Sequence, residues 1–164
     1  MTTTDELLAN NANYAKSFDG SLAVRPSLQL AVVACMDARI NVYGVLGLHE
    51  GEAHVIRNPG GVITEAEIRS LAISQRLLGT QKIILIHHTD CGMSGFSEEE
   101  FKASVAEDTG LQPSWTGAAF IDEYEDVVES MKRIKDSAFV PHTDQVRGFV
   151  FNVATGVLEE VTAS

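Results

Sequence analysis

The sequence of 164 residues is poor in cysteine, has no long apolar run and has few basic residues. Its two cysteines can form one disulfide at most, which a chain long enough to bury a core rarely needs, or they can supply half of a metal site. No apolar run approaches the ~20 residues that cross a bilayer. With 12 basic against 23 acidic residues, the formal charge is −11. Such a surface repels nucleic acid and anionic lipid, so we expect neither nucleic acid nor a membrane as a partner.

The first twenty residues lack the features of a leader peptide. They hold acids and asparagines, with neither a basic n-region nor a continuous apolar h-region. We therefore expect no signal peptide and a cytoplasmic protein. Apolar residues at 45% and charged residues at 21% are the balance of a globular protein. Because no repeat or linker interrupts the chain, residues 1–164 are predicted to form one domain.

Predicted strands and helices alternate along the chain. Strands are predicted where apolar, often β-branched residues run together, at 28–35, 52–58 and 82–88, and a closing hairpin is predicted over 145–161. Helices are predicted from caps and helical spacing at 4–18, 64–79, 97–110 and 118–136. This order predicts an α/β fold: a mostly parallel central sheet of four strands with a C-terminal antiparallel strand, and helices on both faces.

The first predicted helix differs from the others. Residues 4–18 carry Thr4 as a possible cap and acids in the first turn, but their apolar face is thin and asparagine is frequent. Such a helix is better suited to lie across a partner subunit than to nucleate a core. Residues 1–20 are therefore predicted to be an N-terminal helical arm onto the partner.

Polar, metal-ligating residues follow two of the predicted strands. Cys35, in "CMDAR", ends the first strand, and Cys91 follows the strand that ends in "HH" within "HHTDC". The carboxyl ends of parallel strands meet at one edge of a sheet, so two thiols and an imidazole can converge there as a zinc-like set. The alternative is that both cysteines are ordinary buried thiols. The paired motifs on two strand ends favour the metal.

Alternation along the strand decides between His87 and His88, because neighbouring strand residues point to opposite faces. His88 stands three residues before Cys91, which favours it as the ligand and leaves His87 for the opposite helix layer. Only three protein ligands are then available, and an open fourth position is typical of catalytic rather than structural zinc.

Asp37 and Arg39 follow Cys35 closely. They can be a surface ion pair of little energetic value. Beside a zinc ion, Asp37 can instead accept the proton of the metal's hydroxide and orient it, with Arg39 keeping the carboxylate ionised. Asp37 can also close the site by ligating the metal itself.

The combination of "CMDAR", "HVIRNPGG" and "HTDCG", in this order and spacing, resembles the β-class carbonic anhydrases, and in particular the compact prokaryotic and archaeal forms. The resemblance covers nearly the whole chain. It implies zinc on three ligands, a catalytic dyad, and backbone amides that bind the substrate. The positions that match are Cys35, His88 and Cys91 for zinc, Asp37 and Arg39 for the dyad, and Gly60, Gly61 and Gly92 for the substrate.

The resemblance also implies an activity, a zinc lyase that uses zinc hydroxide for reversible hydration of carbon dioxide to bicarbonate. It implies a homo-oligomer, a dimer or dimer of dimers with active sites at the subunit interface. Two alternatives stay open: a carbonyl sulfide or carbon disulfide hydrolase with the same zinc site, and a non-catalytic structural or redox-sensing zinc protein. An apolar entrance lined by residues such as Leu48, Val62 or Phe96 would favour the sulfur substrates.

Overall fold

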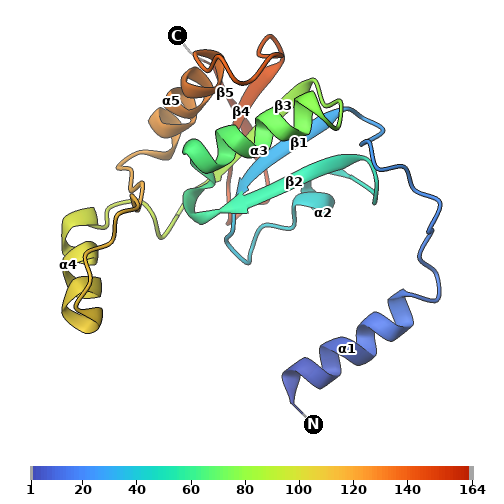
Figure 1. Cartoon of the computed structure of the whole chain (residues 1–164), viewed down its shortest axis with the longest axis horizontal. Helices are drawn as coiled ribbons and strands as arrows, with labels where there is room; N and C mark the ends of the chain where they lie inside the picture. The colour runs from blue at the N-terminus through green and yellow to red at the C-terminus, as the bar shows by residue number, and fades with distance from the viewer. Residues whose placement is uncertain (1, 163–164) are drawn as a thin grey trace.

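The computed structural model of the chain describes residues 2–162 (Figure 1). One five-stranded sheet has the order β2-β1-β3-β4-β5. Its first four strands pair in parallel and the last pair is antiparallel, which confirms the predicted α/β fold. The strands are β1 Leu30–Cys35, β2 Ala53–Asn58, β3 Lys82–His88, β4 Val146–Phe151 and β5 Leu158–Val161.

Two hydrophobic clusters cover the two faces of this sheet. On one face, α3 (Glu65–Arg76) and α5 (Glu123–Lys135) pack against residues such as Val33 and Leu85. On the other, the short helix α2 (Val42–Leu46) and adjoining loops pack against residues such as Val32 and Ile86. Because both faces are covered, the central strands are apolar at successive positions rather than alternately polar.

Local capping explains where the helices begin. The predicted capping box between Thr64 and Glu67 is present at the start of α3, and Ser97 caps α4 (Glu98–Thr109). The last helix was predicted from residue 118, but it begins at Glu123 because the Asp122 carboxylate accepts the first free N–H groups. The cap of the first helix, α1 (Thr3–Tyr14), is Thr2 rather than Thr4. The sequence reasoning missed α2, whose five residues are too few for helical periodicity to be visible.

Helices α1 and α4 extend away from the sheet (Figure 1). Neither contains a buried residue, and Leu7 and Leu8 of α1 are 62% and 63% exposed. A 12-residue helix is marginal in water without tertiary packing. Within residues 2–162, no helix is long and apolar enough to span a bilayer.

Gly148 of β4 tests how closely α5 packs on the sheet. A Cβ at this position would overlap Val127 Cγ1 and lie 3.1 Å from Met131 Sδ, both on α5. We expect Gly148→Ala to lower the free energy of unfolding by about 1–3 kcal/mol, because the helix must move to make room. Urea denaturation measures the change.

The matched control is Gly20→Ala, where the added methyl group meets nothing within 4 Å. Its free energy of unfolding should stay near that of the parent chain or rise slightly. Equal destabilisation by both substitutions would contradict this close packing of α5 on β4.

Candidate metal centre

Three predicted ligands converge where β1 and β3 end. The two strands are parallel neighbours, with Ala34 opposite Ile86, so their carboxyl ends lie side by side. The ligand atoms of Cys35, His88 and Cys91 all lie within 4.8 Å of one another, and all three residues are buried. The distance between the two Sγ atoms is 4.0 Å, and His88 Nε2 lies 3.1 Å from Cys35 Sγ.

This donor set fits zinc. Two sulfurs bound to one tetrahedral zinc at about 2.3 Å lie about 3.8 Å apart, close to the separation of the two sulfurs here. The carbonyl oxygen of Thr89 accepts from His88 Nδ1 at 2.9 Å. Because that bond places the ring proton on Nδ1, Nε2 is left as the atom that faces the sulfurs.

His87 lies on the other side of the sheet. Its ring is fully buried and its Nε2 is 2.6 Å from Asp126 Oδ2 on α5. It also packs against the ring of Phe120. The opposite orientations of His87 and His88 follow from strand alternation, as predicted from the sequence.

The two thiols have different proton affinities. The pKa of Cys35 is lowered to about 4, chiefly by the hydrogen bond from Cys91 and also by His88 and the backbone N–H groups of Asp37 and Gly60, against the effect of burial. The pKa of Cys91 is raised by the same contact with Cys35 and by burial. The hydrogen bonds to Cys35 therefore favour its thiolate, which is the form that ligates metals.

Asp37 and Arg39 form a bidentate ion pair beside the cluster. Arg39 Nε donates to Asp37 Oδ1 at 3.0 Å and Nη2 donates to Oδ2 at 2.8 Å. The guanidinium and the Arg39 backbone N–H hold the pKa of the Asp37 carboxyl well below its usual range. Asp37 Oδ2 lies 3.7 Å from His88 Nε2. Arg39 therefore holds the carboxylate close to the nitrogen donor of the cluster.

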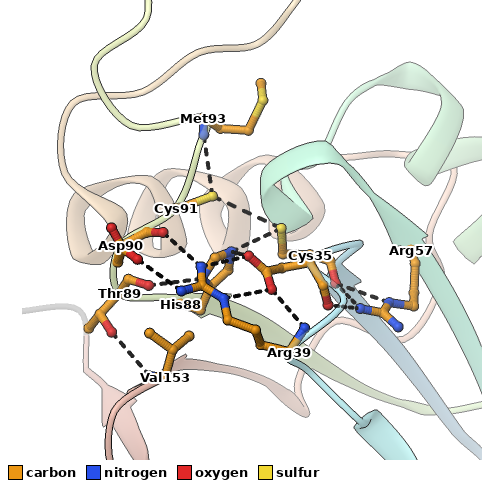
Figure 2. A network of polar contacts seen from close by, with 10 residues as sticks. Cys35, Arg39, Arg57, His88, Thr89, Asp90, Cys91, Met93 and Val153 are labelled. Carbon is orange, nitrogen blue, oxygen red and sulfur yellow. Dashed lines mark hydrogen bonds and ion pairs between the residues drawn. The ribbon is translucent and has the colours of Figure 1, made fainter.

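The sequence reasoning gave no role to two further residues of this site. Arg57 of β2 donates to the carbonyl oxygens of Cys35 and Asp37, and Asp90 contacts Arg39 from the loop after β3 (Figure 2). Both lie within motifs that the sequence shows, "HVIRNPGG" and "HTDCG". Their presence there was the available signal, but their partners depend on the tertiary structure.

The three glycines have different surroundings. Gly61 has φ +75, and a Cβ there would lie 2.9 Å from both Cys35 N and Ile86 O. Gly60 has φ +82, and its N–H helps to lower the pKa of Cys35. Nothing lies within 4 Å of a Cβ built on Gly92. Gly61 is thus required for close backbone approach, whereas Gly92 borders open space.

An apolar cavity of about 800 Å³ adjoins the cluster. Met36 and Met93 line it, and each is close to a ligand: Met36 follows Cys35, and the Met93 N–H lies 3.5 Å from Cys91 Sγ. Phe96 also lines this cavity, as the sequence suggested for an entrance. Val62 and Leu48 instead belong to the hydrophobic cluster around Cys35.

Comparison with known proteins shows which protein family this chain resembles in sequence and structure. The profile of the carbonic anhydrase family matches residues 30–154. Beta-carbonic anhydrase 1 of Mycobacterium tuberculosis is 56% identical over 162 residues, 99% of each chain. The crystal structure of carbonic anhydrase from Streptococcus mutans superposes with a TM-score of 0.90 at 36% identity, covering 99% of each chain. A carbon disulfide hydrolase of Acidithiobacillus thiooxidans is 32% identical over 151 residues, 79% of this chain and 75% of that one.

The parallel sheet and the buried set of two thiols and an imidazole define an α/β protein whose donor set fits a metal ion. The family match and the whole-length identity are more specific: the chain belongs to the β-carbonic anhydrase family.

Removing the imidazole tests the metal site. We expect His88→Ala to lose most of its zinc on dialysis, because two thiols remain where three donors converged. Atomic absorption measures the zinc bound per chain. The control is His142→Ala, which removes an exposed histidine outside the cluster and should retain zinc. Equal zinc in both variants would contradict the assignment of His88.

Proposed function

We propose that this chain catalyses the reversible hydration of carbon dioxide to bicarbonate and a proton, with zinc held by Cys35, His88 and Cys91. The observation that carries the proposal is the Asp37 carboxylate, held by Arg39 at 3.7 Å from His88 Nε2. A structural zinc site does not need a carboxylate fixed by an arginine beside it. The identity of 56% to a beta-carbonic anhydrase over 99% of both chains supports the same activity.

Zinc, when bound, supplies a Lewis acid that lowers the pKa of water to about 7. Asp37 orients the nucleophile. Because its pKa lies below the usual range, it is ionised at neutral pH and can only accept hydrogen bonds. It therefore holds the nucleophile's proton and directs the oxygen lone pair away from itself. The stabilisation of this charged form is present above the unfolded pKa of about 3.9 and is lost as the pH falls through the lower folded value.

The substrate is small, linear and apolar, and the cavity beside the cluster is lined largely by apolar side chains. We assign substrate binding to the backbone near Gly60, Gly61 and Gly92. Of these, Gly92 has open space where a side chain would stand. Gly61 keeps the backbone close to Cys35, and Gly60 contributes to the field around the Cys35 sulfur.

A carbon disulfide or carbonyl sulfide hydrolase is the second candidate. The apolar cavity lined by Met36, Phe96 and Trp115 favours it, as does the similarity to a carbon disulfide hydrolase. That similarity is weaker, 32% identity against 56%. Carbon dioxide is therefore the preferred substrate.

Residues 1–20 are proposed to be an arm that packs on a partner subunit in a homodimer or a dimer of dimers. The support is α1 itself, which contains no buried residue and whose leucines are largely exposed in the single chain. An isolated helix of this length is not expected to be stable.

The activity is tested by stopped-flow hydration of carbon dioxide from about pH 6.5 to about 9, with zinc content assayed. We expect Asp37→Ala to retain zinc and to lose about a hundredfold or more in kcat, the range for a proton-holding side chain. The control is Asp136→Ala, another aspartate in an ion pair, bound to Lys132 and remote from the cluster.

Hydration should be unchanged in the control. If the zinc-loaded parent chain hydrates no carbon dioxide at any pH, the proposed activity is wrong. Turnover of carbonyl sulfide or carbon disulfide by the same sample would then support the second candidate, and no turnover of any of the three would leave a non-catalytic zinc protein.

The arm is tested by a charge on its apolar side. We expect Leu8→Asp to shift the protein toward monomer, because a carboxylate would replace an apolar side chain that packs on the partner subunit. Light scattering during gel filtration measures the molar mass. Asn10→Asp adds the same charge about 200° around the helix and should leave the assembly unchanged. A dimer in both variants would contradict this role of α1.

A further inference from the structure

The Arg39 guanidinium forms ion pairs with two aspartates that come from different strand ends. Asp37, after β1, accepts from Nε and Nη2. Asp90, after β3, accepts from the same guanidinium twice: its Oδ2 from Nη1 at 2.8 Å and its backbone carbonyl from Nη2 at 3.0 Å. The ion pair between Asp37 and Arg39 is thus attached to the loop that also carries Cys91.

We propose that Asp90 is a positioning residue, which fixes the Arg39 guanidinium so that Asp37 is held beside the three metal donors rather than on the metal. This role rests on the proposed function, since it concerns the same carboxylate. It is a role toward Arg39, the residue to which the Asp90 side chain is hydrogen-bonded.

The backbone of Asp90 supports this assignment. Its φ is +56, in the left-handed region that few residues other than glycine, asparagine and aspartate adopt readily. The preceding residue, Thr89, is fixed to the end of β4: its N–H donates to Phe151 O and its Oγ1 accepts from the Val153 N–H. In this conformation the carbonyl and the carboxylate of Asp90 both face the guanidinium.

The side chains of Asp37 and Arg39 are not fixed by the Arg57 contact, which holds only the backbone carbonyl of Asp37. They are two residues apart on one loop, and the Arg39 side chain is 46% exposed. Two side chains bonded only to each other can still move together, even where the backbone of their loop is held. The bonds to Asp90 connect it to β3, from which His88 and Cys91 come, and so set where Asp37 Oδ2 lies relative to His88 Nε2.

Three substitutions separate the role of the side chain from that of the backbone. Asp90→Gly keeps the left-handed conformation and removes the carboxylate. Asp90→Asn keeps both the conformation and an oxygen acceptor for Nη1, so it should act as a rescue. Gln29→Gly is the matched control, because Gln29 is exposed and has nearly the same backbone angle, φ +52, at the start of a different strand.

The readout is the visible spectrum of the Co²⁺-loaded protein at one neutral pH, which reports the ligands of the metal, alongside kcat and KM. We expect the Co²⁺ bands of Asp90→Gly and of Arg39→Ala to shift in the same direction, because both substitutions release Asp37. We expect kcat to fall about tenfold with KM little changed, as for a misplaced group in a catalytic site. Asp90→Asn and Gln29→Gly should keep the parent spectrum and kcat.

The double variant Asp90→Gly with Arg39→Ala gives the decisive comparison. If Asp90 acts through Arg39, adding Asp90→Gly to Arg39→Ala changes neither the spectrum nor kcat further. Additive effects, or a parent-like spectrum in Asp90→Gly, would overturn the proposal. Because the spectrum needs only bound Co²⁺, this test also holds if the chain hydrates no carbon dioxide. A coupled spectral shift without hydration would then refute the activity and not the positioning role.

Discussion

The parallel pairing of β1 with β3 is the constraint on which the rest of the site depends. These are central strands of the sheet, and their register places Ala34 opposite Ile86, so Cys35 and His88 emerge at the same edge. The donors are then buried by the surrounding apolar cluster, where unpaired polar groups are costly. Hydrogen bonds between the sulfurs and the imidazole satisfy them, and the proposed zinc would do the same. The spacing of the donors is therefore fixed by sheet geometry and not by the loops alone.

Seven arginines occur in this acidic chain, and two of them act at this one edge. Arg57 donates to backbone carbonyls of the segment after β1, and Arg39 connects that segment to the loop after β3. A guanidinium has five donors in a planar fork, so one side chain can hold several acceptors in fixed directions. Lysine would provide the charge but not this geometry. The region around the metal donors is thereby made rigid by hydrogen bonds to main-chain as well as side-chain oxygens.

Features that depend on periodicity and capping could be predicted from the sequence, whereas features that depend on tertiary contact could not. Strand alternation was enough to separate His88 from His87, and the cap at Thr64 located the start of α3. Helix α2 was missed because five residues show no period, and α5 begins later than predicted because the cap at Asp122 was not recognised. Asp90 appeared only as a polar residue between two ligands. Its partner is 51 residues away, and nothing in the linear pattern identifies it.

The separation of the two hydrophobic clusters has a consequence for how this protein can change. The packing of α3 and α5 lies on one face of the sheet, and the metal donors lie with the cluster on the other. Substitutions in the first cluster can raise or lower thermal resistance while the spacing of the donors stays the same. Substitutions that change thermal stability and substitutions that change substrate preference can therefore occur at different residues. His87 is the exception. Its side chain lies on the face covered by α5, and the next residue in the chain, His88, is one of the donors on the opposite face.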